Sequence, residues 1–162
     1  MDPDALRRLR ESSGLNLDRE GRFFHQGTPI EHARTVAALH AGLHRAEDGR
    51  WATRIGRDWG YVDVEDAARF VRRVEPRADR LRAQLATGEW VETDPATLAA
   101  GADDALYVRL PDGERARLTR AAQLSLAPFV AESEGGFELR LPERVFHIGR
   151  DSGREPVRSQ RS

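Results

Sequence analysis

A supersecondary pattern that occurs twice is the feature that most constrains how this chain can fold. Residues 17–51 and residues 106–137 each predict a tight hairpin, a Ser/Thr-type helix cap, a helix, a glycine turn and an aromatic strand. Such self-similarity predicts an internal duplication. The cleft between two similar halves is a natural place for a ligand. Neither copy contains a catalytic motif, so the pattern predicts an architecture rather than a reaction.

The start of the first predicted helix carries the strongest local signal. Thr28 is predicted as the N-cap, Pro29 as the first helical residue, and Glu31 as the residue that completes a capping box. Apolar residues then recur at helical spacing, at Val36, Leu39 and Leu43. We expect this helix to pack on a sheet and to end near Ala46.

The rest of the chain is predicted to be rich in strands. Alternating or β-branched residues indicate strands within 50–75, at 80–85, 106–110 and 137–141, and near 145–148, with residues 56–60 as a loop. In the second half we expect Thr119 to cap a helix and Pro128 to end it. The predicted class is α+β, in four segments: an N-terminal arm or short helix (1–13), an N-terminal domain (14–75), a C-terminal domain (76–149) and a disordered tail (150–162).

Composition excludes several classes of protein. The 162-residue chain has no cysteine, so it has no disulfides and no thiolate chemistry. All 26 basic residues are arginine, and the absence of lysine excludes Schiff-base chemistry and a phosphate-loop lysine. The net charge of −1 argues against nucleic-acid binding. No apolar run approaches the roughly 20 residues of a membrane span, and the start lacks a signal-like apolar region, so we expect a cytoplasmic protein.

Two linked motifs resemble the bacterial domain-of-unknown-function family 1285. One is the run from Gly21 to Ile30, with its glycine, paired aromatics, histidine and Pro-Ile ending, and the other is the Val-Glu-Asp-Ala run at 64–67. The resemblance extends from about Leu15 to Gly149. The chain departs from the family where Ala68-Arg69-Phe70 replaces Pro-Phe, and where Arg57-Asp58-Trp59 replaces a Glu-Lys pair.

The resemblance implies tandem α+β domains with repeated motifs, the second loosely similar to a pleckstrin-homology-like barrel. It also implies a ligand site between the domains, for a nucleotide-like molecule in signalling, and it brings no established enzymatic activity. The departures near residues 57–59 and 68–70 weaken the case for a charge-dependent ligand contact there.

His40 and His44 lie four residues apart on the first predicted helix, a spacing at which two imidazoles can reach one metal ion. No glutamate follows His40 in a protease-type motif, and histidines are common on the polar side of an amphipathic helix. We therefore predict no metal site and no cofactor.

His25 lies at the predicted strand-to-helix junction, where helix amides could hold an anion and an imidazole could add a donor. A capping box formed by Thr28 and Glu31 would already fill those amides, which favours a structural role for His25. Glu65 and Asp66 are adjacent carboxylates of the kind used in acid–base chemistry. Neighbours on a strand point to opposite faces, which favours a solvated strand end or a pair with an arginine.

The aromatic residues offer stacking surfaces for a base, although aromatics at strand positions more often belong to the core. Trp59 is the preferred ligand contact, because it is predicted to lie in a glycine-flanked loop where packing is less demanding. Trp51, Tyr61 and Trp90 lie in predicted strands, where aromatic residues more often belong to the core.

The first functional hypothesis is a non-enzymatic module that binds a small anionic, nucleotide-like ligand between its two halves. The contacts expected for it are His25, Arg34, Trp59, Tyr61 and Asp66. The alternative is a protein-interaction or self-association domain, which would form a homo-oligomer or bind a partner through an exposed sheet edge. The third is a weak hydrolase that uses His25 and the Glu65/Asp66 pair.

Overall fold

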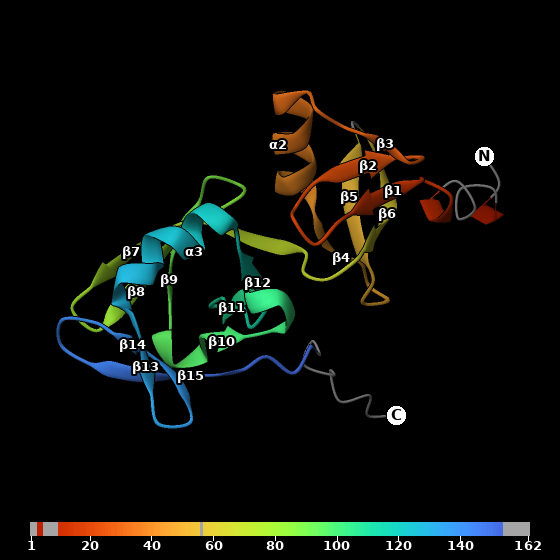
Figure 1. Cartoon of the computed structure of the whole chain (residues 1–162). Coiled ribbons are helices and arrows are strands. Elements are labelled where there is room, and N and C mark those ends of the chain that lie inside the picture. The colour runs from red at the N-terminus through yellow and green to blue at the C-terminus, as the bar shows by residue number, and fades with distance from the viewer. Residues whose placement is uncertain (1–2, 5–9, 56, 154–162) are drawn as a thin grey trace. The chain divides into compact units, whose positions relative to one another are not determined.

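The computed structural model describes residues 3–4, 10–55 and 57–153, and contacts divide the chain into two compact units, Met1–Ala68 and Arg69–Ser162 (Figure 1). The sequence placed the first boundary after Glu75. Strand β7 (Arg69–Arg77) instead belongs to the second unit, because it pairs with two strands there and buries Phe70 and Val71. Each unit mixes helix and strands, which confirms the α+β class.

The first unit contains a six-stranded sheet in the order β3-β2-β1-β6-β5-β4. Strand β1 pairs antiparallel with β2 and parallel with β6. Apolar side chains of β1 and β2, Leu15, Leu17 and Phe23, are buried in its core. The strands are β1 (Leu15–Leu17), β2 (Phe23–His25), β3 (Thr28–Pro29), β4 (His44–Arg45), β5 (Trp51–Ile55) and β6 (Asp58–Val64).

The helix of the first unit, α2 (Ala33–Gly42), begins later and ends earlier than the sequence predicted. Thr28 is paired with His25 in the β2–β3 ladder, so its backbone is extended and it cannot cap a helix. The N-cap position is His32, which makes no side-chain capping bond. The capping-box prediction was therefore wrong. Residues 44–45 form an edge strand, so the helix stops before Ala46.

Helix α2 lies against β5, and a hydroxyl fixes the contact. Thr53 is fully buried, and its Oγ1 donates a 2.8 Å hydrogen bond to the carbonyl oxygen of Leu39. At the helix end, a Cβ on Gly42 would lie 3.1 Å from the backbone nitrogen of Arg54, so the close approach suits glycine. This packing leaves the opposite face of β5 and β6 for other residues.

The loop predicted at residues 56–60 is mostly strand. Strand β6 begins at Asp58, and residues 58–61 pair with Ile55–Ala52 of β5. Gly56 lies outside the described residues. Gly60 is buried, and a Cβ added to it would lie only 3.0 Å from the Cβ of Ser13, so this glycine serves close packing rather than a loop. Trp59 is therefore held on a paired strand.

The second unit contains a nine-stranded sheet in the order β13-β14-β15-β10-β11-β12-β7-β8-β9. Its core is one cluster of apolar residues that includes Val71, Leu81, Val108 and Leu139. The strands after β7 are β8 (Arg80–Leu85), β9 (Trp90–Thr93), β10 (Ala99–Ala100), β11 (Leu106–Arg109), β12 (Arg115–Leu118), β13 (Val130–Ser133), β14 (Gly136–Arg140) and β15 (Val145–Arg150). The strands predicted in this half are confirmed.

The helix of the second unit, α3 (Arg120–Leu126), starts and stops where the sequence predicted. Thr119 is its N-cap, and Thr119 Oγ1 accepts a 3.3 Å hydrogen bond from the backbone nitrogen of Ala122. Pro128 lies in a following 3-10 turn (Ala127–Phe129), which ends the α-helix. Another 3-10 turn, Pro95–Thr97, is capped by Asp94, and a third covers Ala102–Asp104.

The predicted equivalence of the two halves fails at its key position. Both units contain a hairpin, then a helix, then further strands. Thr119 opens a helix, whereas Thr28 lies in a strand, so the two threonines do not hold corresponding places. The strand pairing differs as well, because β1 pairs directly with β6 while β11 reaches β15 through β10.

Parts of the two predicted terminal segments are also described. At the N-terminus Pro3, Asp4, Arg10 and Glu11 are helical, whereas Leu6 and Leu9 of the predicted short helix lie outside the described residues. The tail was expected to begin at Arg150, but that residue ends β15, and Asp151 is held by a buried ion pair. The remainder of the predicted tail, 154–162, lies outside the described residues.

Candidate functional site

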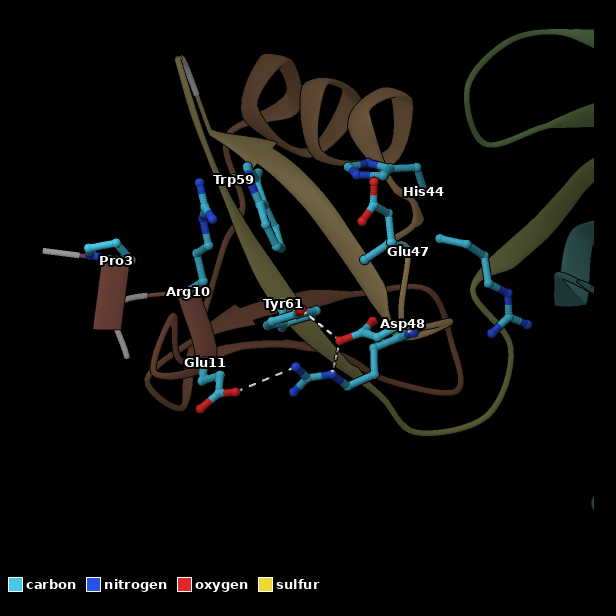
Figure 2. A pocket seen from close by; sticks show the side chains of 11 residues that line it. Pro3, Arg10, Glu11, His44, Glu47, Asp48, Trp59 and Tyr61 are labelled. Carbon is cyan, nitrogen blue, oxygen red and sulfur yellow. Dashed lines mark hydrogen bonds and ion pairs between the residues drawn. The ribbon is translucent and has the colours of Figure 1, made fainter. Parts of the chain in front are cut away.

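A cavity of about 880 Å³ opens in the first unit (Figure 2). Its walls come from three places: the N-terminal segment, the chain from β4 into the following turn, and one face of β6. The lining combines two aromatic rings, three arginines, three carboxylates and a histidine. This mixture of flat apolar surface and paired charges is typical of a site for a small polar molecule.

Strand β6 supplies the aromatic wall. Trp59 and Tyr61 are two residues apart, so both point to the same side of the strand. Their ring centroids lie 5.1 Å apart with an interplanar angle of 83°, an edge-to-face contact. Ser13 Oγ donates a hydrogen bond to the carbonyl oxygen of Tyr61 and ties the N-terminal segment to this strand.

The turn between β4 and β5 supplies the charged wall. Gly49 has a φ of 85°, a conformation that favours glycine, and its nitrogen donates to the carbonyl oxygen of Ala46 at 2.9 Å. Asp48 Oδ1 accepts a 3.0 Å hydrogen bond from the backbone nitrogen of Arg50. The turn therefore points the side chains of Asp48 and Arg50 toward the aromatic wall.

Asp48, Arg50 and Tyr61 form one interacting group, drawn with dashed lines in Figure 2. The Tyr61 hydroxyl donates to Asp48 Oδ2 at 2.7 Å, and Arg50 Nε donates to the same oxygen at 2.9 Å. The Arg50 guanidinium carbon lies 3.5 Å from the Tyr61 ring centroid. A weaker contact of 3.5 Å links Arg50 to Glu11 Oε1. Arg50 is thus held flat on Tyr61 with one edge toward carboxylates.

The same contacts shift the ionisation of this group. The hydrogen bond from Tyr61, followed by the backbone bond from Arg50, lowers the pKa of the Asp48 carboxyl. The carboxylate of Asp48 in turn raises the pKa of the Tyr61 hydroxyl above its usual value and raises the pKa of Arg50. Asp48 is therefore ionised and Tyr61 neutral at neutral pH, so the tyrosine acts as a hydrogen-bond donor.

Arg10 completes the site from the N-terminal segment. Its guanidinium carbon lies 4.1 Å from the Trp59 ring centroid, a cation–π contact. Among the residues that the structure describes, Arg10 has no carboxylate within ion-pair distance. Figure 2 shows Arg10 on one side of Trp59 and Glu47 on the other. No described carboxylate therefore accepts hydrogen bonds from the Arg10 guanidinium, and its N–H groups can bind a ligand in the cavity.

All of the chain's tryptophans and tyrosines carry an arginine in this way. The guanidinium carbons of Arg45, Arg82 and Arg115 lie 4.4, 5.1 and 3.8 Å from the ring centroids of Trp51, Trp90 and Tyr107. Guanidinium groups thus cover the aromatic faces in both units.

The structure brings two of the five predicted contacts together. Trp59 and Tyr61 line the cavity side by side. The other three do not line it. His25 is exposed on β2, Arg34 is exposed in the first turn of α2, and Asp66 is half-buried beyond the end of β6.

The two histidines considered for a metal ion lie in different surroundings. His40 is buried, and its ring packs edge-on against Phe23 with centroids 4.7 Å apart, so it does not lie on the polar side of the helix. His44 lies past the helix, and its Nδ1 donates to the carbonyl oxygen of Gly42 at 2.7 Å. Within the described ranges, 3–4, 10–55 and 57–153, no cluster of three or more histidine and carboxylate side chains is arranged to hold a metal.

The residues named for a hydrolase are separated. His25 is paired with Leu15 at the first residue of β1, whereas the backbone nitrogen of Glu65 bonds to Leu17 at the last. Glu65 Oε1 accepts a 3.0 Å hydrogen bond from Arg19 Nε, which matches the expected pair with an arginine. The imidazole of His25 and the carboxylate of Glu65 are therefore not brought together.

Sequence reasoning missed Arg10, Asp48 and Arg50. The glycine turn before Trp51 was predicted. Only the pairing of β5 with β6, however, shows that this turn lies beside Tyr61. The alternation of Trp59 with Tyr61 was the available signal. Recognising β6 as a strand from Asp58 onward would have placed both rings on one face and suggested a surface for nearby arginines.

Comparisons with known proteins identify the fold. No protein-family model and no curated protein matches the chain. A crystal structure of a DUF1285 family protein from Silicibacter pomeroyi DSS-3 is similar with a TM-score of 0.65 and 21% identity, over 86% of this chain and 81% of that one. A second DUF1285 family protein, from Shewanella baltica OS155, is similar with a TM-score of 0.54 and 20% identity, over 72% of this chain and 91% of that one.

Among the described residues, no helix is long and apolar enough to cross a membrane. The match to the two crystal structures agrees with the motifs at Gly21–Ile30 and Val64–Ala67. The chain therefore has the fold of DUF1285 family proteins.

Proposed function

We propose that this chain is a non-enzymatic binding module that takes a small anionic ligand into the cavity of its first unit. The observation that carries the proposal is Arg10, which lies on Trp59 at the cavity wall without a carboxylate partner among the described residues. A guanidinium fork in this position suits a phosphate or a carboxylate, which it binds through two hydrogen bonds.

The chemistry of the other walls favours a ligand that also carries hydroxyl groups. Glu47 and Asp48 present acceptors on the wall opposite Arg10, while Arg50 presents a second cation. The cavity of about 880 Å³ falls within the range of small-molecule sites. A nucleotide-like ligand meets these demands: its phosphate pairs with Arg10, its sugar hydroxyls donate to the carboxylates, and its base stacks on a guanidinium plane.

The proposed site needs residues of the first unit alone. Trp59 and Tyr61 remain in it from the predicted set, and Arg10 and Arg50 take the role first given to Arg34. A part in signalling rests on the family resemblance and not on any contact described above.

The test is a thermal-shift screen of nucleotides and matched nucleosides. A ligand that binds the folded state raises the melting temperature in a dose-dependent way. We expect at least one phosphate-bearing ligand to do so, with the effect lost in Arg10→Ala. Arg82→Ala is the matched control, because Arg82 also lies over an indole, that of Trp90, in the other unit. Absence of any shift, or equal loss in both variants, would refute the proposal.

A second candidate function is protein interaction or self-association through the second unit. Phe137 and Val145 on the β14–β15 hairpin are 49% and 54% exposed, and β13 forms the free edge of that sheet. Exposed apolar side chains beside a sheet edge suit an added strand or a partner. The loose similarity of the second unit to a pleckstrin-homology-like barrel, which the family resemblance implies, is part of this second proposal. Sedimentation at several concentrations would support it if Phe137→Ser abolished a measured self-association.

A further inference from the structure

We infer a second binding site, for a small tetrahedral oxyanion, on the second unit. It lies in a cavity of about 290 Å³ whose lining includes Tyr107, Arg109, Arg115, Arg150 and Asp151. This inference does not depend on the function proposed for the first unit. It rests on the strand register, on one buried ion pair and on Arg150 at the cavity wall.

The register of the β11–β12 hairpin collects cations on one face. Tyr107 is paired with Arg117, and Arg109 is paired with Arg115, so these four side chains point to the same side of the sheet. The intervening pair, Val108 and Ala116, points the other way into the apolar core. One face of a short hairpin therefore presents three arginines around a single tyrosine ring.

Arg115 is fixed within this face. Its guanidinium carbon lies 3.8 Å from the Tyr107 ring centroid, and Arg117 donates a 3.3 Å hydrogen bond to the Tyr107 hydroxyl. Arg115 Nε and one terminal nitrogen donate to the two carboxylate oxygens of Asp151, at 3.0 and 2.6 Å. The pair is a two-bond fork that already holds one oxyanion, the carboxylate of the chain itself.

Beyond this pair, the cavity is lined by a further cation, Arg150. Its described lining contains three arginines and one carboxylate, so the cations outnumber the anions. The cavity of the first unit is balanced by comparison, with three arginines and three carboxylates. Among the described residues Arg150 has no carboxylate within ion-pair distance. A second, external oxyanion beside Asp151 would pair with Arg150.

Size and chemistry together define the occupant. A cavity of about 290 Å³ is at the lower limit of small-molecule sites, so it holds a phosphate or sulfate group more readily than a nucleotide. Arginine forks match the geometry of such groups. The geometry therefore points to inorganic phosphate, or the phosphate of a compact monoester, held chiefly by Arg150.

Isothermal titration of the full chain with inorganic phosphate tests the site. We expect saturable binding that weakens at least tenfold in Arg150→Ala. Arg73→Ala is the matched control, since Arg73 is an exposed arginine on β7 of the same unit. The loss in Arg150→Ala should persist when both proteins also carry Arg10→Ala, which separates this site from the first cavity. Absence of saturable binding, or an equal loss in Arg73→Ala, would overturn the inference.

A second variant tests the place of the anion next to Arg115. Asp151→Asn keeps the shape of the side chain and removes its charge, so the Arg115 fork loses its counter-ion. Phosphate should then raise the melting temperature of Asp151→Asn by more than that of the unchanged protein. Equal shifts would contradict this placement.

O-phosphoserine in the same titration separates the two sources of the phosphate group. Binding of inorganic phosphate alone indicates a free oxyanion, and binding of both indicates a phosphate-bearing ligand.

Discussion

Arg115 and Asp151 lie 36 residues apart in the sequence and form a buried two-bond ion pair in the second unit. Only 4% and 9% of their side-chain surfaces are exposed. Because the pair joins β12 to the residue after β15, it fastens the end of the described chain to the centre of the sheet. We predict that Asp151→Ala destabilises the protein by about 3–5 kcal/mol, since it removes the carboxylate that neutralises a buried guanidinium.

Glu138→Ala is the control for that prediction, measured in the same urea titrations. Glu138 and Arg140 are also 2.6 Å apart, but the arginine side chain is 60% exposed. An exposed pair contributes less than about 1 kcal/mol. Equal losses in the two variants would show that burial does not set the strength of the Arg115–Asp151 pair.

Gly101 makes a close contact with the ring of Tyr107. A Cβ at this position would lie 2.7 Å from Tyr107 Cε2, so an alanine must displace the ring. We predict that Gly101→Ala costs about 1–3 kcal/mol, as overpacking does, and changes the near-ultraviolet circular dichroism of the tyrosines. At Gly149 no atom lies within 4 Å of such a Cβ, so Gly149→Ala should leave both the stability and the spectrum unchanged.

The two threonines that were predicted to cap helices should respond differently to substitution. Thr119→Ala removes the 3.3 Å bond to the amide of Ala122 and should cost about 1 kcal/mol of folding stability. Thr28→Ala changes an exposed residue of the short strand β3 and should alter stability by less than about 0.5 kcal/mol. Thermal melts of the two variants check this, and a larger loss at Thr28 would contradict the helix start at Ala33.

The Tyr61 hydroxyl should titrate above its usual pKa of 10.0, because it donates to the carboxylate of Asp48. Since the folded pKa is raised, this contact stabilises the fold fully below pH 10.0 and is lost as the pH rises through the raised value. For Asp48, whose pKa is lowered, the contribution is present above pH 3.8 and is lost as the pH falls. The absorbance difference between the protein and Tyr61→Phe isolates this titration. Asp48→Asn should return the pKa of Tyr61 toward 10.0, and an unchanged value would contradict the contact.

Local sequence signals predicted the second unit better than the first. The strand predicted at 106–110, the tight hairpin that follows it and the Thr119 cap all depend on signals within a few residues, and the structure contains each of them. In the first unit Thr28 had two competing uses. Its pairing with His25 closes a two-residue hairpin through Gln26 and Gly27, both at positive φ, and this local strand pairing prevailed over the capping box.

The candidate site was predictable only in part, because its decisive contacts span long distances in the sequence. Trp59 and Tyr61 could be named as aromatic contacts from their residue types. Arg10 comes from the N-terminal segment, and nothing in the pattern near it indicates that it reaches Trp59. Asp48 and Arg50 reach Tyr61 through the β5–β6 register, which the assignment of residues 56–60 to a loop concealed.

Nuclear magnetic resonance of the indole N–H groups of the three tryptophans, followed during a nucleotide titration, tests binding in the first cavity most directly. Trp59→Phe and Trp90→Phe assign the two signals that matter. If the ligand binds between Arg10 and Arg50, the Trp59 signal shifts with saturation while that of Trp90 stays in place. A shift confined to Trp90, or no shift at saturating ligand, would contradict binding in the first cavity.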